Sequence, residues 1–556
     1  MLGVGVGLPQ VALWNRRGSA AFSPASLFAN GEQGWWYDPS NFATLFQDAA
    51  GTTPVTAVEQ PVGLQLDLSK GLVLGPELVT NGDFSNGTTG WSNITATLSV
   101  VAGEGVVTSA SSFGYVRQTM TTVVGKTYQF TLNARVGTTN RFTFAVASGV
   151  VNAETTSSTT VPLRCVYTAT ATTTNIWLQV NNAGTAFVDN ISVKELAGNH
   201  RFQTSSANRP VVSARVNLHT KTDLLSGSNG WLLNGTPTIT SDPDVPAGQG
   251  FPNSTKIVTT GTFQGPYQNV TNVGVSNTKG VWLKGGAGGE VVGITDSGNT
   301  GGTFVLTTDW AFYTKTWTTV GAASGILISA SGKTVYVAGV DVRPADQGVG
   351  LPAYQRVNTS TDYDTTGFPV YIKPNGSNQF MQTNSINFTA TDKMTVWAGV
   401  RKLSDAALAV LAELSPIADI GSFTLTAPTN GTGYFFRSKG TTTGAVAESL
   451  LFAAPITNTL TGLGNISGDL ATLRVNGTQV AQSTADQGTG NYGNYPAYFY
   501  ARAGTSLFFN GNDYGSIARG AASTATQITN GETYMAIKTG FTAPVITGLP
   551  TIGVTA

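Results

Sequence analysis

Two stretches of this sequence repeat each other and determine how the chain can be divided. Residues 80–91 and 220–231 share a threonine, an aspartate, two glycines and a tryptophan at identical spacing, so each shared residue recurs 140 positions later. Each stretch is followed by a long run of strand-like sequence that closes on a valine-rich segment, at residues 187–193 and 335–342. A repeat of this length predicts two copies of one all-β domain rather than the short units of a solenoid. We call these copies the first and the second module.

Composition favours an all-β chain of several domains. A length of 556 residues is typical of about three to four domains. Charged residues make up only 11% of the chain and glycine is frequent, which favours strands and turns over long helices. The formal net charge is zero, so the sequence predicts no basic surface and no nucleic-acid partner.

Cysteine and histidine restrict the chemistry that is available. Cys165 is the only cysteine, so no disulfide can form within the chain, and its alternating surroundings predict a buried, inert thiol. The only histidines, His200 and His219, lie in linker-like sequence. Two such residues argue against a histidine-based metal site or a Ser-His-Asp arrangement.

The N-terminal segment is apolar but short. Residues 1–8 alternate glycine with leucine or valine, and no positive charge precedes them, so they do not fit a signal peptide or a membrane span. In an extended strand all of these glycines lie on one face, where another backbone can approach. Two interpretations stay open: an anchor that docks into a partner or a symmetry mate, and a frayed terminus.

Residues 36–58 carry a resemblance to a known family. They run Trp-Tyr-Asp-Pro-Ser-Asn-Phe-Ala-Thr-Leu-Phe-Gln-Asp-Ala-Ala-Gly-Thr-Thr-Pro-Val-Thr-Ala-Val and resemble the opening of tailed-bacteriophage structural proteins with a concanavalin A-like, laminin-G-type jelly roll. In that family the opening continues through a Gly-Asn-His segment into an Arg-Pro turn. Here the pieces are separated, because one ends at residues 66–71 and the next begins at residues 198–210. Exposed loops tolerate such insertions.

The resemblance implies an all-β, multidomain β-sandwich or jelly-roll protein, in which two inserted jelly-roll modules interrupt a laminin-G-like domain. Residues 394–400 look like the central strand of that domain, and residues 404–414, although helix-like in composition, look like a turn leading into a strand. The expected segments are an N-terminal virion anchor (1–26), the start of the laminin-G-like domain (27–75), the first module (76–196), a return segment (197–214), the second module (215–350), the main body of the laminin-G-like domain (351–540) and a C-terminal tail (541–556).

The two modules resemble carbohydrate-binding jelly rolls attached to xylanases and glucanases. The residues that carry this resemblance are the Asn-Gly-Asp-Phe start at 81–84, the Gly-Trp pair at 90–91 and the closing Val-Asp-Asn-Ile-Ser-Val at 188–193. In that family a structural calcium often joins the first and last strands. Carried over, Asp83 and Asp189 are its ligands; the alternative is that Asp83 caps a turn and Asp189 is a surface residue.

Sugar-binding modules stack aromatic rings on pyranose rings and bond the hydroxyl groups with amides and carboxylates. The candidates for such rings are Tyr115 and Trp177 in the first module and Tyr267 and Trp282 in the second. The alternative for each is a place in the core or at its rim. Trp91 and Trp231, each directly after a glycine, are expected to be buried and to fasten the start of their modules.

Catalytic acids are not expected. Jelly-roll glycosidases need two acids on one strand facing a cleft, whereas the expected central strand at 394–400 contains none. Glu413 and Asp419 lie too far apart to share a strand face in an obvious way.

The resemblance to tailed-phage structural proteins, together with the lack of paired acids, implies a non-enzymatic structural protein on the surface of a tailed-phage virion. The first expectation is a tail fibre or receptor-binding protein that contacts host cell-surface polysaccharide and joins other virion proteins through its N-terminal segment. A capsid decoration or head-fibre protein is the rival, and a polysaccharide depolymerase is a second alternative. A homotrimer is expected by analogy with such fibres alone.

Overall fold

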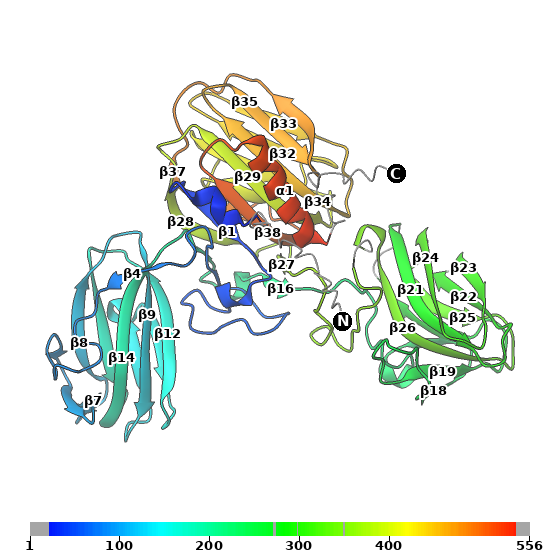
Figure 1. Cartoon of the computed structure of the whole chain (residues 1–556), viewed down its shortest axis with the longest axis horizontal. Helices are drawn as coiled ribbons and strands as arrows, with labels where there is room; N and C mark the ends of the chain where they lie inside the picture. Colours follow the sequence, from blue (N-terminus) through cyan, green and yellow to red (C-terminus); the bar gives the residue numbers. More distant parts are fainter. Residues whose placement is uncertain (1–21, 271–273, 297–298, 348–350, 541–556) are drawn as a thin grey trace, which may run out of the picture.

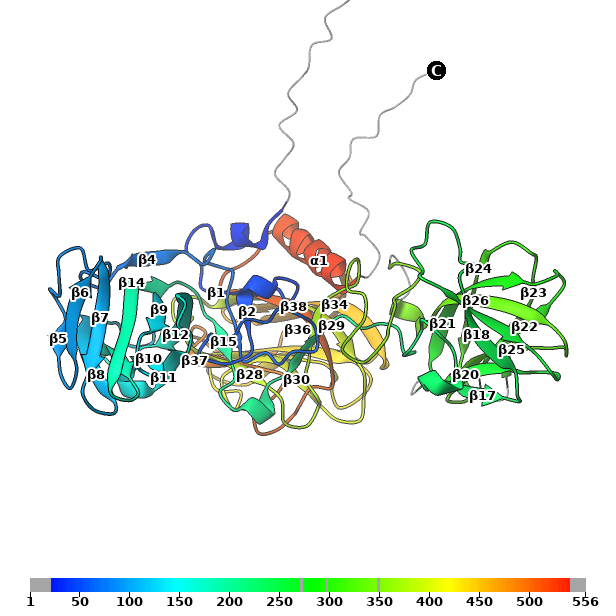
Figure 2. The same cartoon turned by 90° about the horizontal axis from the view of Figure 1, so that it is seen from below.

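The computed structural model describes residues 22–540 except 271–273, 297–298 and 348–350. It confirms the all-β expectation, with 47% strand, 7% helix and antiparallel sheets throughout. Of the expected N-terminal anchor, residues 1–21 lie outside the described residues, as does the whole C-terminal tail at 541–556. Three lobes lie in a row, with a central domain between the first and the second module (Figures 1 and 2).

The central domain consists of two sheets built from strands that are far apart in the sequence. The eight-stranded sheet contains, in pairing order, β16 (Val211–Ser213), β27 (Tyr371–Lys373), β38 (Gly511–Arg519), β29 (Lys393–Lys402), β34 (Ile456–Asn465), β35 (Leu470–Val475) and β36 (Thr478–Ser483), with β1 (Gly34–Tyr37) also paired to β38. The nine-stranded sheet contains β2 (Leu45–Phe46), β3 (Leu64–Gln65), β15 (Arg201–Phe202), β28 (Met381–Asn387), β37 (Asn494–Phe499), β30 (Val410–Leu414), β31 (Ser422–Thr426), β32 (Tyr434–Lys439) and β33 (Gly444–Ser449).

The first module is a sandwich of two sheets formed only by the strands between β4 and β14. Its six-stranded sheet contains β12 (Val161–Thr168), β9 (Thr127–Val136), β14 (Gly184–Leu196), β7 (Glu104–Ser109) and β6 (Thr97–Val101), with β4 (Leu74–Glu77) also paired to β14. Its five-stranded sheet contains β11 (Val151–Thr155), β10 (Phe142–Val146), β13 (Thr173–Val180), β8 (Gly114–Thr121) and β5 (Ser92–Asn93).

The second module repeats this strand order. One sheet contains β17 (Leu232–Asn234), β20 (Gly265–Asn269), β25 (Ala323–Ile328), β22 (Val291–Asp296) and β23 (Asn299–Val305). The other contains β18 (Thr238–Asp242), β19 (Ser254–Val258), β26 (Thr334–Pro344), β21 (Ser276–Gly285) and β24 (Ala311–Thr318). Read from the opposite edge, each sheet pairs its strands in the same succession as its counterpart in the first module.

The threonine that begins each repeat is held in the same way in both modules. Gln118 accepts a hydrogen bond from the Thr80 amide (2.8 Å) and donates one to its carbonyl (2.9 Å). Gln268 does the same with Thr220, at 3.0 and 2.8 Å. The shared threonine is therefore the point at which the entering chain is fixed to β8 in the first module and to β20 in the second.

The shared tryptophans also play matching roles. The indole N–H of Trp91 donates to the Asn81 carbonyl (3.3 Å), and that of Trp231 donates to the Lys221 carbonyl (3.0 Å). Trp231 is buried as expected, whereas Trp91 is only partly buried at the rim of the first module's core.

One difference between the two module cores is the polarity of three matched positions. Phe130, Ile176 and Val79 are buried apolar residues in the first module. The strand registers put Lys279 and Ser324 at the positions of Phe130 and Ile176. His219 stands 140 residues after Val79.

These three substitutions make a buried polar cluster in the second module. The Lys279 ammonium donates to the carbonyl of Gly325 (2.6 Å) and to the hydroxyl of Ser324 (3.3 Å), which lies 3.2 Å from His219 Nε2. Burial lowers the pKa of Lys279 to about 7 and lowers the pKa of His219. His219 therefore belongs to a core, and His200, whose Nδ1 accepts from the Asp67 amide, is also buried. Both histidines lie in connecting segments, as the sequence predicts, but these segments run through the interior and bury the two rings.

A buried ion pair joins three distant parts of the central domain. Arg201 of the return segment donates to Asp513 of β38 at 3.1 and 3.2 Å and to Gln65 of β3 at 2.6 and 2.9 Å. The Tyr500 hydroxyl also donates to Asp513 (2.6 Å), and the ring of Tyr37 lies 4.6 Å from the guanidinium. Residues on either side of the first module therefore belong to one core.

The only α-helix among the described residues, α1 (Ala525–Thr539), lies over the eight-stranded sheet of the central domain (Figure 2). It begins at a capping box between Thr524 and Gln527 and ends at Gly540 in a left-handed conformation. A Cβ on Gly531 would lie 2.6 Å from the indole of Trp397, so glycine lets the helix approach the sheet closely. Residues 351–540 were expected to form the main body of a laminin-G-like jelly roll, and the sequence did not predict this helix.

The described residues also contain six short 3-10 helices, of which the first precedes β1 and the other five lie between strands. They are η1 (Pro24–Phe28), η2 (Phe42–Thr44), η3 (Ala147–Gly149), η4 (Ser206–Asn208), η5 (Gly227–Asn229) and η6 (Ala345–Gln347).

The first module packs against the opening of the central domain. Arg164 of β12 donates to the Gly51 carbonyl (3.0 Å), and its guanidinium lies 4.3 Å from the centroid of the Phe46 ring. On the other side of this contact, Asn384 of β28 donates to the hydroxyl of Thr168 (3.1 Å). Hydrogen bonds and a cation–π contact thus fix the module beside β2 and β28.

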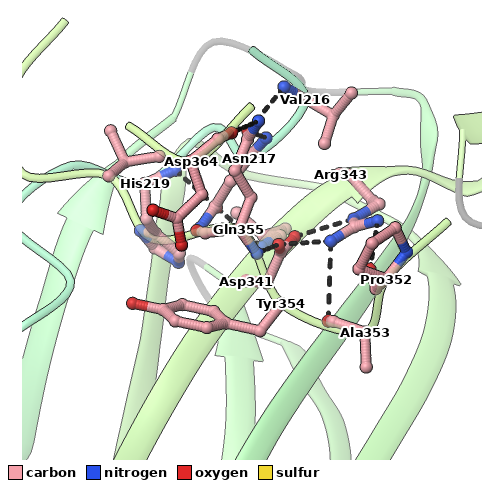
Figure 3. Close-up of polar contacts among 12 residues, drawn as sticks. Val216, Asn217, His219, Asp341, Arg343, Pro352, Ala353, Tyr354, Gln355 and Asp364 are labelled. Atoms are coloured by element: carbon pink, nitrogen blue, oxygen red, sulfur yellow. Dashed lines mark hydrogen bonds and ion pairs between the residues drawn. The ribbon is translucent and has the colours of Figure 1, made fainter. Parts of the chain in front are cut away.

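The second module is joined by two chain segments that are clamped to each other (Figure 3). The Gln355 amide oxygen accepts from the backbone of Val216 (2.8 Å) and Asn217 (3.0 Å). Its nitrogen donates to the carbonyls of Ala214 (2.9 Å) and Asp364 (2.8 Å). One side chain thus satisfies four backbone groups at the junction.

Candidate functional site

The outer face of the five-stranded sheet of the first module carries a stacked aromatic pair. Tyr115 lies on β8 and Trp177 on β13, and burial alternates along both strands so that these side chains point away from the core. Their ring centroids are 4.4 Å apart with an interplanar angle of 19°. Both rings are partly exposed. The structure thus brings together two residues that the sequence named as candidates for sugar stacking.

Polar side chains surround this pair on the same face. Gln179 is the register partner of Tyr115, and Arg117 is the register partner of Trp177. Asn175 lies two residues before Trp177, and its side-chain oxygen accepts from Thr119 (2.6 Å), which leaves its amide protons directed elsewhere. We call Tyr115, Trp177, Arg117, Gln179 and Asn175 the outer platform.

One buried polar atom within the outer platform lacks a partner. The indole nitrogen of Trp177 is buried and makes no hydrogen bond within the described chain. Buried polar groups are nearly always paired, and an orphan costs about 1–3 kcal/mol.

The second module does not bring its two candidates together. Tyr267 lies on β20 in one sheet, whereas Trp282 lies on β21 in the other. Trp282 packs against Phe312, with ring centroids 5.5 Å apart.

The registers explain why the second module lacks the stacked pair. Arg117 pairs with both Ser92 and Trp177, and Tyr267 pairs with Leu232 and Gly325 in the same way. Tyr267 therefore takes the place of Arg117, and glycines at 325 and 265 take the places of Trp177 and Tyr115. At Gly325 a Cβ would lie 2.5 Å from the Cβ of Tyr267. Within the repeat, the outer platform belongs to the first module alone.

The two predicted calcium ligands lie at the junction of the first and last strands of the first module. The Asp83 carboxylate accepts from the amide and the hydroxyl of Ser85, at 3.2 and 2.9 Å, and Asp83 is fully exposed. Asp189 accepts from the amide and the side chain of Asn190, at 2.7 and 3.0 Å. In the parts of the chain that the structure describes, no group of three or more histidine, cysteine, aspartate or glutamate residues is arranged to hold a metal. Calcium binding by this pair stays a prediction.

Glu77 holds this junction and was not identified from the sequence. Its carboxylate accepts from the backbone of Val79 (3.0 Å) and Val193 (2.7 Å) and from the hydroxyl of Ser192 (2.6 Å). It therefore joins the entering chain to the closing strand, as the expected calcium would. The sequence feature that could have identified Glu77 is its position three residues before the repeated Thr80.

Glu413, one of the two acids considered in the central domain, has structural partners. Glu413 is fully buried, and Arg502 donates to both of its oxygens at 2.8 and 2.9 Å. Thr424 donates to it as well (2.9 Å). Its strand, β30, also confirms that residues 410–414 form a strand rather than a helix.

In the part of the chain that the structure describes, none of the helices could span a lipid bilayer.

No family model matches the chain, and no curated protein matches it. Among solved structures, the N-terminal CBM22-1–CBM22-2 tandem domain of Paenibacillus barcinonensis Xyn10C is 12% identical over 49% of this chain and 98% of that chain, with a TM-score of 0.19. The CBM40 of Ruminococcus gnavus IT-sialidase, bound to α2,3-sialyllactose, is 15% identical over 27% of this chain and 96% of that chain, with a TM-score of 0.22. Both are carbohydrate-binding modules.

Proposed function

We propose that the protein is a non-enzymatic glycan-binding protein whose first module binds polysaccharide on the outer platform. The observation that carries this proposal is the stacked pair of Tyr115 and Trp177 on an outward sheet face. Partly exposed aromatic rings offer apolar surface to a pyranose ring, and the amides of Gln179 and Asn175 offer donors and acceptors for its hydroxyl groups.

We place this activity on the surface of a tailed-phage virion, in a tail fibre or receptor-binding protein that contacts host polysaccharide. The resemblance of residues 36–58 to tailed-phage structural proteins supports this setting. The N-terminal segment, as an anchor to other virion proteins, and a trimeric assembly belong to the same proposal. Calcium at Asp83 and Asp189 is a structural cofactor within it.

A structural rather than catalytic role for the central domain is supported by Glu413. Both oxygens of this carboxylate accept hydrogen bonds from Arg502, and one also accepts from Thr424, so the group stabilises the sheet. It is not free to transfer a proton to a glycosidic oxygen, a step for which glycosidases pair two accessible acids.

The proposal is tested by measuring the binding of the purified protein to host cells and to extracted surface polysaccharide. Trp177→Ala removes one ring of the stack and is expected to weaken binding by about tenfold or more. Trp282→Ala is the matched control, because it removes a tryptophan from the module that lacks the platform, and it should leave binding unchanged.

Three outcomes would contradict the proposal in different ways. Absence of binding to any polysaccharide would favour the capsid decoration role. Equal binding by wild type and Trp177→Ala would place the site elsewhere. Release of reducing ends from the polysaccharide would show a depolymerase.

A further inference from the structure

Arg117 is the one charged residue of the outer platform. It lies directly across from Trp177 in the strand register and two residues from Tyr115 on the same strand, so its side chain leaves the sheet on the face of the stacked pair. The side chain is partly exposed. A ligand resting on the two rings would therefore lie beside a guanidinium.

This guanidinium has no partner, unlike its neighbours. The structure shows no hydrogen bond or ion pair of Arg117 within the described residues, whereas Arg141, at the end of the same sheet, is bonded to Glu154 (3.2 Å) and Asn181 (2.9 Å). On the opposite sheet, Arg135 is bonded to Glu104 through both terminal nitrogens. Carboxylates of the module thus neutralise Arg141 and Arg135, whereas Arg117 is left for an external anion.

The chemistry of the unpaired guanidinium selects the class of ligand. Arginine presents donors in a planar fork that matches the two oxygens of a carboxylate, and such charge-assisted pairs are stronger than neutral hydrogen bonds. Resting on the proposed glycan-binding function, we infer that the outer platform is specific for acidic polysaccharides, with Arg117 binding the carboxylate of a sugar whose ring stacks on Tyr115 and Trp177. The second module, which has Tyr267 in place of Arg117, takes no part in this recognition.

The experiment compares each polymer with its own uncharged form. Polygalacturonate, alginate and hyaluronan are immobilised beside the same polymers after chemical reduction of their carboxyl groups, and binding of the full-length protein is measured at low and high NaCl. Wild type is expected to bind at least one carboxylated polymer about tenfold or more tightly than its reduced form. This preference should shrink as salt screens the pair.

Three variants assign the effect to Arg117. Arg117→Gln is expected to abolish the preference for the carboxylated polymer while keeping the residual binding of the reduced form. Arg117→Lys keeps the positive charge but not the planar pair of N–H donors. Its preference for the carboxylated polymer should lie between those of wild type and Arg117→Gln. Lys194→Gln removes one positive charge from the other sheet of the module, where Lys194 lies 3.9 Å from Glu77, and should leave the preference unchanged.

The outcomes separate this inference from the function on which it rests. Equal binding of carboxylated and reduced polymers, unaffected by Arg117→Gln, would overturn the acidic specificity and leave glycan binding in place. A preference for the carboxylated polymer that survives Arg117→Gln would overturn the role of Arg117. Binding to no polymer of either kind would overturn both proposals.

Discussion

Arg201 and Asp513 form an ion pair at 3.1 Å in the interior of the central domain, although the second module and much of the central domain separate them in sequence. Their side chains are 0% and 2% exposed, so water does not screen the pair. Arg201 follows the first module and Asp513 lies on the last strand of the central domain. The pair therefore shows that segments on either side of the second module fold into one domain.

Arg201→Ala is expected to destabilise the central domain by about 3–5 kcal/mol, because it leaves the Asp513 carboxylate buried without its charge partner. Urea unfolding followed by the fluorescence of the tryptophans in this domain measures the change. Arg356→Ala is the control: Arg356 is partly exposed, with Asp362 as its nearest carboxylate at 2.8 Å, and should cost about 1 kcal/mol or less. A loss for Arg201→Ala no greater than for Arg356→Ala would show that the three segments do not share this core.

The interruption of the central domain could be predicted from the sequence because repeats and motifs are local signals. The repeated threonine and tryptophan mark the start of each module, and both serve the same contacts in the two copies. Helix α1 was missed although Thr524, Gln527 and Gly540 carry local cap signals. The strand-rich composition of the whole chain outweighed a short helix whose role, covering Trp397, depends on tertiary contact.

Cys165 should not react in the folded protein. It is fully buried, and burial raises the pKa of its thiol to about 12, so almost no thiolate exists at pH 8. Native protein treated with a thiol-reactive chromophore at pH 8 is expected to show no labelling over a time in which the urea-unfolded protein labels fully. Rapid native labelling would mean that β12 opens readily.

The candidate site could be predicted only in part, because sequence does not show which residues share a sheet face. Tyr115 and Trp177 were identified as aromatics in strands, and their stacking depends on the pairing of β8 with β13. Tyr267 and Trp282 were chosen by the same reasoning and lie on different sheets. Arg117 was not identified, since a single arginine in a strand carries no signal until its register partner is known.

Gln355→Ala is expected to loosen the junction of the second module without unfolding either side. The substitution leaves four backbone groups at residues 214, 216, 217 and 364 without their partner (Figure 3). Each unsatisfied buried group costs about 1–3 kcal/mol, although water that enters the opened junction recovers part of this. Limited proteolysis should cut the variant faster between the module and the central domain.

The control for this prediction is Gln249→Ala, which alters an exposed glutamine within the second module. It should leave the proteolysis rate unchanged. If Gln355→Ala is cut no faster than Gln249→Ala, contacts other than the Gln355 clamp hold the junction.

Lys279→Met is expected to stabilise the second module. The pKa of Lys279 is about 7 in the folded protein against 10.5 for a free lysine side chain. The unfolded chain therefore binds a proton more tightly between these values, and the stability of the module rises with pH across this window. From pH 7 to pH 9.5 the gain is about 3 kcal/mol, and below about pH 6 this group adds no further dependence. Methionine has no charge to desolvate and fills a position that Phe130 fills in the first module.

Hydrogen exchange of the backbone amides of β21, measured at pH 7 and at pH 9.5 after correction for intrinsic rates, tests this directly. Wild type should show markedly greater protection at pH 9.5, and Lys279→Met should show high protection at both values. Lys315→Met on β24 is the matched control, because Lys315 belongs to the same sheet but is exposed, and its protection should follow wild type. A wild-type protection independent of pH, together with destabilisation by Lys279→Met, would mean that Lys279 remains protonated and that its bonds to Gly325 and Ser324 stabilise the core more than its desolvation costs.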